Sequence, residues 1–368
     1  MKIAMLGHKR IPSREGGVEI VVNELSTRMA ALGHDVTVYN RGGKHVLGGE
    51  NINLKNYKGV KIKKVITIDK KGLAAMTSSF FASLCCAFGR YDVVHFHAEG
   101  PCAMIPIVKL FGKRVVATIH GLDWQRAKWG GFATKYIKFG EQMAVRYADE
   151  IIVLSQNVRE YFIKEYNRNT VFIPNGIEKP KQCPVKFIKD KFGLEKDEYI
   201  LFLGRIVPEK GIAYLIEAFE NVKTDKKLVI AGGASDTGEF MEELKKLAYG
   251  DERVVFTGFV QGRELAELYG NAYVYTLPSD LEGMPISLLE AMSYGNCCLV
   301  SDIPECTEVI GDKAVVFEKS NIESLKNKLQ MLCDNPKMVD KYKRNANEYI
   351  CSRFNWNDVV NKTLGLYE

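Results

Sequence analysis

The sequence predicts an α/β protein made of two doubly wound domains that face each other across a cleft. Short β-like runs alternate with amphipathic helical runs along the chain, and this alternation pauses once near the middle before it restarts. The length of 368 residues suits two domains, and 46% apolar with 26% charged residues is ordinary for a globular protein. Disorder and collagen-like structure are therefore excluded.

The first half is expected to form a parallel sheet covered by helices on both faces. Apolar and β-branched runs predict strands at 2–6, 36–39, 93–96, 115–119, 151–154 and 171–173. Apolar residues at helical spacing predict helices between them, at 18–32, 134–147 and 158–166. This alternation of strand and helix is typical of a parallel sheet.

Proline and glycine, which interrupt regular structure, occur at 174–176 and are followed by Pro180 and Pro184. They predict the linker between the domains. The alternation then restarts, with strands expected at 199–203, 227–231, 254–256, 273–276 and 297–300. The tail from Pro336 is helical, and a break near Phe354 would let its last segment cross elsewhere. We therefore expect domains at residues 1–176 and 177–354.

Composition favours a reduced, cytoplasmic setting. The nine cysteines include no C-x-x-C spacing, which argues against a disulfide framework and against a zinc ribbon. The stretch Met1–Gly7 is typical of a buried first strand and not of a signal peptide. The most apolar long stretch, Leu73–Phe88, is shorter than the ~20 residues that a membrane-spanning helix needs.

Positive charge is concentrated in the first half of the chain. The formal net charge of +6 is the sum of +11 over residues 1–178 and −5 over residues 179–368. We infer that only the first half faces an anionic partner or surface. A chance imbalance of solvated charge is the alternative.

Ligands of doubly wound sheets bind where strands end and loops lead into helices. Gly16 and Gly17 open the helix after the first strand, where a ligand could reach backbone N–H groups at the positive end of the helix. A tight turn that requires positive φ is the alternative. His120 directly follows the strand at 115–119 and is expected to face the ligand, although a lone histidine is more often structural. No G-x-G-x-x-G fingerprint occurs, which argues against a dinucleotide cofactor.

Two cations follow the first strand of the second half. Arg205 and Lys210 are five residues apart across a loop and a helix start, which suits a diphosphate. Arginine can hold two oxygens at once, while lysine acts as a point charge. A solvated charge pair beside Glu209 is the alternative.

Two carboxylates follow the strand at 273–276. Glu282 lies in the loop, and Glu290 lies inside the next helix, which Ser287 is expected to cap. Seven residues separate the two glutamates, so they would reach different parts of one elongated ligand rather than form a close dyad.

Four motifs together resemble the retaining GT-B glycosyltransferases of family 4. They are Gly16-Gly17-Val18-Glu19, Thr118-Ile119-His120-Gly121, the turn from Gly204-Arg205 to Lys210-Gly211, and the Glu282-x7-Glu290 spacing. Their order and spacing match over essentially the whole chain. The segment from Gly121 to Trp129 is most similar to that of bacterial enzymes that build capsule, exopolysaccharide or cell-wall glycans, including rhamnosyltransferases.

The resemblance implies a role for each of these residues. The catalytic set would be His120, Glu282, Arg205 and Lys210, and the donor diphosphate would be held by Gly16, Gly17, Arg205 and Lys210. The nucleoside and sugar would be bound by Glu290, Glu282, Gly283, Met284, Ile286, Phe259 and Val260, and the acceptor side would include Arg10, Glu19, Asp123 and Trp124. The last segment, residues 355–368, would cross back onto the first domain.

The chain departs from the family pattern in two loops. Met284-Pro285 replaces the common Phe-Gly, and proline lacks an N–H that could reach the sugar. The loop 231–236 also differs from the commoner Gly-Asp-Gly form. No Asp-x-Asp occurs, so we expect no metal and no other cofactor, with cations and helix dipoles stabilising the diphosphate instead. For a retaining transfer we expect front-face attack without a covalent intermediate on Glu282.

The implied partners are a nucleotide-sugar donor, with UDP favoured, and a glycan or polyprenyl-diphosphate-linked acceptor of surface polysaccharide synthesis. The basic first half favours an anionic membrane surface on the cytoplasmic side, contacted by Lys9, Arg10 and Arg14 and by 73–88 with Lys70-Lys71. A core-packed helix at 73–88 is the alternative.

Other functions remain as hypotheses. A sugar-nucleotide epimerase or a pyridoxal-dependent phosphorylase would share the architecture, and an inactive nucleotide-sugar-binding subunit or sensor would share the binding residues. The presence of all five residues Glu282, Glu290, Arg205, Lys210 and His120 argues against an inactive relative. No basic and aromatic stripe supports a nucleic-acid partner.

Overall fold

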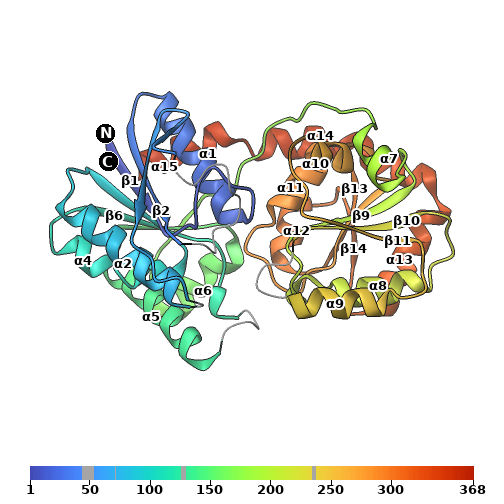
Figure 1. Cartoon of the computed structure of the whole chain (residues 1–368), viewed down its shortest axis with the longest axis horizontal. Coiled ribbons are helices and arrows are strands. Elements are labelled where there is room, and N and C mark those ends of the chain that lie inside the picture. Colours follow the sequence, from blue (N-terminus) through green and yellow to red (C-terminus); the bar gives the residue numbers. More distant parts are fainter. Residues whose placement is uncertain (44–53, 71, 126–129, 234–237) are drawn as a thin grey trace. The chain divides into compact units, whose positions relative to one another are not determined.

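The computed structural model describes residues 1–43, 54–70, 72–125, 130–233 and 238–368. The chain divides into two compact units, each with a central sheet between layers of helices (Figure 1). Unit 1 comprises Met1–Gly176 together with Trp356–Glu368, and unit 2 comprises Ile177–Asn355. The division between Gly176 and Ile177 falls where the sequence places the linker, and the returning segment starts one residue later than expected.

The sheet of unit 1 has eight strands in the order β3-β4-β2-β1-β5-β6-β7-β8. All neighbours are parallel except β3 and β4, which pair antiparallel. The strands are β1 (Lys2–Leu6), β2 (Asp35–Arg41), β3 (Asn56–Tyr57), β4 (Val60–Val65), β5 (Val93–His97), β6 (Arg114–Ile119), β7 (Glu150–Val153) and β8 (Val171–Phe172).

Two layers of helices cover this sheet. Figure 1 shows α1 and α15 on one face and α2, α4 and α5 on the other. The helices are α1 (Gly17–Ala31), α2 (Leu73–Phe88), α3 (Glu99–Cys102), α4 (Ile105–Lys109), α5 (Gly131–Tyr147), α6 (Gln156–Tyr166) and α15 (Trp356–Gly365). Helix α15 is held in unit 1 by side-chain bonds near both of its ends: Arg28 Nη1 donates to Asn357 Oδ1 at 3.4 Å, and Tyr367 Oη lies 2.6 Å from His95 Nδ1.

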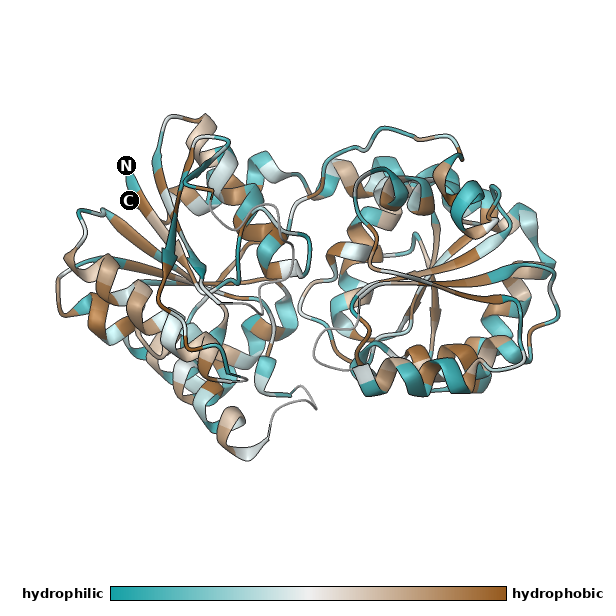
Figure 2. Ribbon diagram, in the orientation of Figure 1, coloured by the Kyte–Doolittle hydropathy of each residue, from teal (hydrophilic) through white to brown (hydrophobic). Residues whose placement is uncertain are grey.

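The sheet of unit 2 has six parallel strands in the order β11-β10-β9-β12-β13-β14. Its strands are β9 (Tyr199–Leu203), β10 (Lys227–Ala231), β11 (Val254–Gly258), β12 (Val274–Leu277), β13 (Cys297–Ser301) and β14 (Val315–Phe317). Its helices are α7 (Phe187–Phe192), α8 (Ile212–Glu220), α9 (Gly238–Leu247), α10 (Gly262–Asn271), α11 (Ile286–Ser293), α12 (Pro304–Ile310), α13 (Ile322–Asp334) and α14 (Pro336–Arg353). Figure 2 shows mostly hydrophobic strands in both sheets, between helices that carry hydrophobic and hydrophilic residues in turn.

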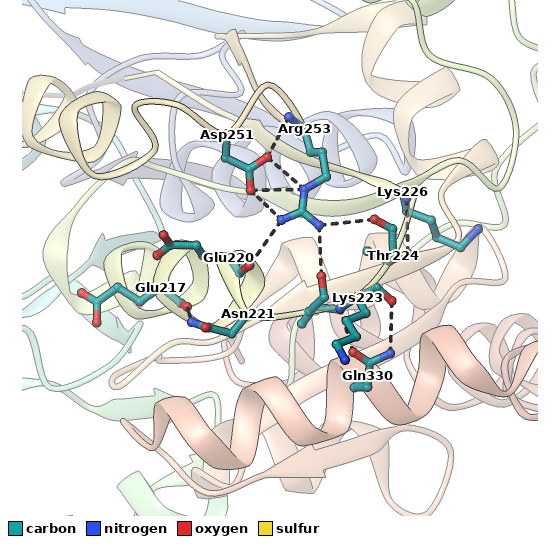
Figure 3. Close-up of polar contacts among 10 residues, drawn as sticks. Glu217, Glu220, Asn221, Lys223, Thr224, Lys226, Asp251, Arg253 and Gln330 are labelled. Atoms are coloured by element: carbon teal, nitrogen blue, oxygen red, sulfur yellow. Dashed lines mark hydrogen bonds and ion pairs between the residues drawn. The ribbon is translucent and has the colours of Figure 1, made fainter.

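A polar network fixes the amino-terminal edge of the second sheet (Figure 3). The guanidinium of Arg253 donates to Asp251 through Nε at 2.9 Å and Nη2 at 2.7 Å, and its Nη1 donates to the carbonyl oxygens of Val222 at 3.0 Å and Thr224 at 3.3 Å. The bond from Arg253 lowers the pKa of the Asp251 carboxyl. These contacts satisfy backbone carbonyls where α8 ends and β11 begins, so this cluster is structural and lies away from the edge where ligands bind.

Three expectations about the elements need correction. Strands β3, β4 and β14 are not among the strands expected from the sequence. Two of them are very short, β3 with two residues and β14 with three, whereas β4 lies near the sheet edge although its alternation of buried apolar residues with exposed lysines is a strand pattern. Ser287 does not cap α11, since that helix begins at Ile286 and its N-cap is Pro285. The apolar stretch Leu73–Phe88 is helix α2, whose buried face packs on the first sheet, and no helix among the described residues is long and apolar enough to span a membrane.

Candidate functional site

The carboxyl edge of the second sheet brings together the loops that follow β9 and β12. These two strands are neighbours although their order in the chain is not consecutive, so the edge between them is the switch point of the sheet. Backbone bonds join the two loops, because the Asp280 N–H donates to the Glu209 carbonyl at 2.9 Å. Gly211 allows a further close approach: its φ is +67°, and a Cβ there would lie 2.1 Å from the Pro278 carbonyl oxygen.

Lys210 and Glu282 form an ion pair at this switch point. The Lys210 Nζ bonds Glu282 Oε1, and the two side chains expose only 11% and 9% of their surface. An ammonium held in this way can exchange its carboxylate partner for the oxygens of an anionic ligand. The pair therefore brings a cation and a carboxylate from two different loops to one point.

Arg205 lies on the same edge. It follows Gly204, whose N–H donates to the Ala231 carbonyl at 3.0 Å, and its own side chain is partly exposed. The next loop passes very close, since Gly232 has φ +155° and a Cβ there would lie 1.8 Å from the Gly204 carbonyl oxygen. Only glycine fits this crossing, which fixes the direction in which the chain leaves β9 toward Arg205.

The residues expected to bind the nucleoside and sugar lie around the start of α11 and the end of β11. Tyr269 Oη donates to Glu290 Oε2 at 3.1 Å. Gly283, Met284 and Ile286 are buried in the turn that leads into α11. Because no side chain caps α11, the N–H groups of its first turn have no side-chain acceptor at the cap.

Phe259 and Val260 follow β11 and differ in exposure. The Phe259 ring is 50% exposed, whereas Val260 is buried. Phe259 lines a surface pocket of about 350 Å³, together with Phe187, Gln261, Arg263 and Glu264. An apolar ring beside this hollow suits a flat aromatic ligand such as a nucleobase.

In unit 1, the loop after β1 is tied down by Glu19. The Glu19 carboxylate is buried and accepts the Lys9 N–H at 2.8 Å. Burial opposes its charge, but this backbone bond and the charges of His8, Lys9 and Arg41 hold its pKa below the usual value. Gly16, the N-cap of α1, has φ −159°, so positive φ does not explain this glycine. A Cβ there would lie 2.6 Å from Glu19 Oε2, so a larger residue would require the Glu19 carboxylate to shift.

His120 does not stand alone at the end of β6. Its Nε2 lies 3.1 Å from Nδ1 of His97, at the end of β5, and the His97 ring stacks on His95 with centroids 4.2 Å apart. His95 in turn lies 2.6 Å from Tyr367 Oη and 2.7 Å from Thr118 Oγ1. Burial lowers the pKa of His95 to about 3 and that of His97 well below its usual value, so both rings are neutral.

Family comparisons match both halves of the chain. Residues 15–179 match the family described as "Glycosyltransferase Family 4", and residues 185–349 match "Glycosyl transferases group 1". Together the two matches span most of the chain. The chain is a GT-B glycosyltransferase of the family 4 type.

Relatives of this glycosyltransferase cover the chain well. An uncharacterized glycosyltransferase of Methanocaldococcus jannaschii is 26% identical and covers 100% of this chain and 98% of its own. The Escherichia coli UDP-Gal:alpha-D-GlcNAc-diphosphoundecaprenol alpha-1,3-galactosyltransferase is 29% identical, over 76% of this chain and 75% of its own. Among solved structures, the sucrose-phosphate synthase of Thermosynechococcus elongatus has a TM-score of 0.85 at 22% identity, covering 100% of this chain and 98% of its own. Anabaena HepE, in complex with UDP and glucose, has a TM-score of 0.81 at 16% identity, covering 99% and 98%.

The expected site residues of the glycosyltransferase are distributed over the two units. Gly16, Gly17 and His120 belong to unit 1, whereas Arg205, Lys210, Glu282 and Glu290 belong to unit 2. On the acceptor side, Arg10 pairs with Glu15 at 2.6 Å, and Trp124 carries the Lys138 ammonium over its ring at 3.8 Å. The segment 126–129, on which the closer bacterial resemblance partly depends, lies outside the described residues, as do Lys71 and residues 234–237.

Sequence reasoning missed four polar residues of the first unit. His8, His95, His97 and Glu99 are all buried near the carboxyl edge of β1 and β5. The available signal was the alternation of His95 and His97 along a strand, because alternate residues share one face of a sheet. Among the described residues, no group of three or more His, Cys, Asp or Glu side chains has an arrangement that could hold a metal ion.

Proposed function

We propose that this protein is a retaining glycosyltransferase that transfers a sugar from a UDP-sugar to a glycan or lipid-linked diphosphate acceptor in bacterial surface polysaccharide synthesis. The observation that carries the proposal is the Lys210–Glu282 pair at the switch point of the second sheet, with Arg205 on the same edge. Two relatives support the choice of partners: the E. coli galactosyltransferase is named for UDP-Gal and a diphosphoundecaprenol-linked acceptor, and HepE was solved with UDP and glucose.

Donor binding would rearrange the Lys210–Glu282 pair. The diphosphate oxygens would take the place of the Glu282 carboxylate on the Lys210 ammonium, and Arg205 would bind a second pair of oxygens. Glu282 would then be released toward the donor sugar, and Glu290 would accept hydrogen bonds from the ribose hydroxyls. Gly16 and Gly17 would let backbone N–H groups approach the phosphates, and Phe259 and Val260 would flank the base.

The transfer would proceed on one face of the sugar. The bond between the anomeric carbon and the UDP oxygen breaks, and the acceptor hydroxyl oxygen bonds the same carbon from the same side. The acceptor proton passes to the departing diphosphate oxygen, while Arg205 and Lys210 stabilise the negative charge that develops there. His120 would contact the donor sugar. No carboxylate has to act as a nucleophile, and no metal ion is required in this scheme.

The first test is binding of the nucleoside diphosphates UDP, GDP, dTDP, CDP and ADP by thermal shift and calorimetry. A ligand that binds only the native state raises the melting temperature with the logarithm of its saturation, so the preferred base should stand out. We expect UDP to give the largest shift, and we expect chelation of divalent ions to leave that shift unchanged. Failure of all five nucleotides to bind would refute the donor site.

Variants locate the binding site. Arg205→Ala and Glu290→Ala should each weaken UDP binding at least tenfold, because each removes a charged hydrogen-bond partner worth about 1.5–3 kcal/mol. Lys245→Met is the matched control, since Lys245 pairs with Glu242 on the exposed face of α9. Equal loss of affinity in the control would mean that the effect is general electrostatics. Retention of the anomeric configuration is read by NMR of the product, and a trapped glycosyl adduct on Glu282 would overturn front-face attack.

An anionic membrane surface is proposed as a further partner of unit 1. Phe88 and Leu110 are 74% and 85% exposed, and the Phe88 ring lies 4.8 Å from that of Phe111. Arg90 and Lys113 follow the two helices that present these side chains. Apolar side chains flanked by cations suit the headgroup region of an anionic bilayer.

Flotation with vesicles containing phosphatidylserine tests this surface. The wild type should float with the vesicles at low salt, and the double variant Phe88→Ser, Leu110→Ser should not. If the variant floats with the vesicles as well as the wild type does, these residues do not form a membrane-binding surface.

A further inference from the structure

Two buried carboxyl side chains meet beneath the loop that follows His120. Glu99 begins α3, Glu141 lies in α5, and neither exposes any surface. Helices α3 and α5 approach closely because residue 140 is glycine: a Cβ there would lie 2.1 Å from the Glu99 carbonyl oxygen. This contact places Glu141, the next residue of α5, against the side chain of Glu99.

One oxygen of each carboxyl group accepts hydrogen bonds from a backbone N–H or from tyrosine hydroxyls. Glu99 Oε2 accepts the Asp123 N–H at 2.8 Å. Glu141 Oε1 accepts the hydroxyl of Tyr161 at 2.8 Å and that of Tyr166. A buried carboxylate needs such donors to offset the loss of water.

The other two oxygens have no such donor. Glu99 Oε1 and Glu141 Oε2 are both buried, and no N–H or O–H group of the described residues donates to either of them. The two carboxyl groups interact in this buried contact of α3 with α5, and the interaction with Glu141 helps to raise the pKa of Glu99. Two ionised carboxylates cannot bond directly, because both only accept hydrogen bonds, so one of the pair must carry a proton.

The surroundings decide which carboxyl group holds the proton. Lys138 Nζ lies 4.0 Å from Glu141 Oε1, and two tyrosine hydroxyls donate to that oxygen, whereas Glu99 accepts one backbone N–H, that of Asp123. Burial raises the pKa of Glu99 well above its usual value, and the Asp123 charge and the bond to Glu141 raise it further. The other titratable groups facing this pair are Cys102 from α3 and Tyr161 and Tyr166 from α6.

We propose that Glu99 is a neutral carboxylic acid that positions the loop from Gly121 to Gln125. It donates its proton to Glu141 through Oε1 and accepts the Asp123 N–H through Oε2. The same network continues to the aromatic residue of the loop, because Lys138 donates to Tyr161 at 3.0 Å and lies 3.8 Å over the Trp124 ring. Glu99 is thus a positioning residue for Asp123 and Trp124, and its link to the acceptor rests on the function proposed above.

The matched variants Glu99→Gln and Glu141→Gln distinguish the effect of the shared proton from the effect of side-chain size and geometry. In Glu99→Gln, the amide N–H₂ replaces the acidic O–H and the amide oxygen still accepts from Asp123, so the geometry is kept and nothing titrates there. In Glu141→Gln, the new amide donates to Glu99, which leaves the ionised carboxylate on Glu99 beside Asp123. Both variants keep the size of the side chain.

The first readout is the infrared carbonyl band of a protonated carboxylic acid at neutral pH. We expect the wild type to show this band, with an isotope shift after exchange in heavy water, and both variants to lack it. The wild-type spectrum tests the proposal by itself, even where a variant fails to fold. A wild type without the band, or a Glu99→Gln variant that keeps it, would overturn the shared proton.

The second readout is the dependence on pH. Folded Glu99 holds its proton above the pH at which the unfolded chain has lost it, so the wild type should lose stability as pH rises from about 4.5 toward the folded pKa. Over that range we compare the folded-to-unfolded ratio of Glu99→Gln with that of the wild type. The variant's ratio, divided by the wild-type ratio, should rise by up to about tenfold per pH unit. Fluorescence of Trp124, identified by the Trp124→Phe variant, should change with the same titration in the wild type and stay constant in Glu99→Gln.

Neither readout requires a donor or an acceptor, so the outcome is independent of the proposed transfer. UDP binding is measured separately as a control. A wild type that does not bind UDP would count against the proposed function and not against the role of Glu99. A wild type and a Glu99→Gln variant with the same pH dependence of stability and fluorescence would refute the positioning role of Glu99.

Discussion

A single pair of side chains, Lys210 and Glu282, holds opposite charges almost out of water on the carboxyl edge of the second sheet. Either charge alone at this position would destabilise the folded state, because a nearly buried charge loses its hydration and would have no opposite charge to offset that cost. In the chain without donor, each residue therefore serves as the counter-ion of the other. This arrangement keeps a cation in place for a diphosphate before the ligand arrives.

Removal of one partner should expose this dependence. Lys210→Met is expected to lower the free energy of unfolding by about 3–5 kcal/mol, since it leaves the Glu282 charge buried and unpaired. The double variant Lys210→Met, Glu282→Gln should recover most of that loss because no charge remains. Urea unfolding followed by circular dichroism measures both, with Lys245→Met expected to change stability by less than about 1 kcal/mol. A double variant as unstable as the single one would contradict the pairing.

At the scale of elements, close approach between backbones decides where functional side chains lie. The sequence predicts α5 and the strands β1, β5, β6 and β9 with bounds close to those observed, because their apolar periodicity is strong. It does not predict the contact between α3 and α5, which depends on Gly140 and joins it to Glu99, 41 positions earlier in the chain. The expected strands also do not include β4, which lies near the edge of the sheet and pairs with β2 and β3.

Two glycines of α5 provide a matched test of this contact. Gly140→Ala should be destabilising by several kcal/mol, because its Cβ would lie 2.1 Å from the Glu99 carbonyl oxygen and would force α3 and α5 apart. Gly131→Ala, at the first residue of the same helix, meets nothing within 4 Å and should be neutral or slightly stabilising. Thermal unfolding of the two variants checks this. Equal effects would mean that helix propensity outweighs the contact.

At the scale of the whole molecule, the end of the chain completes the first unit. Helix α15 belongs to unit 1 although the preceding 179 residues form unit 2. Tyr367 reaches the buried His95, and Trp356 packs against Gly176, where a Cβ would lie 2.7 Å from the Trp356 N atom. Tyr367→Phe should therefore reduce the stability of unit 1 by about 1–3 kcal/mol, because His95 Nδ1 would lose its partner in a buried site. Hydrogen exchange in β5 measures this loss, and β9 in unit 2 is the internal control.

Buried neutral histidines should make unit 1 sensitive to acid. Burial lowers the pKa of His8 to about 4 and that of His95 to about 3, whereas histidine in the unfolded chain has a pKa near 6.5. The unfolded chain therefore binds protons first, and stability falls by about 1.4 kcal/mol per pH unit for each histidine as pH drops below about 6.5. His95→Gln, which cannot titrate, should flatten this decline by one proton in urea unfolding at a series of pH values. An unchanged slope would show that His95 is protonated in the folded state.

The two-unit α/β organisation and the family can be predicted from the sequence, because apolar periodicity, the positions of proline and glycine, and motif spacing are local properties of the chain. Arg205, Lys210, Glu282 and His120 were candidate site residues from the sequence, since each lies in the loop that follows a predicted strand. The pairing of Lys210 with Glu282, the contact of His97 with His120 and the approach of Glu99 to Glu141 could not be predicted in this way. These contacts join residues far apart in sequence, and they depend on strand order and on close backbone crossings that no local pattern records.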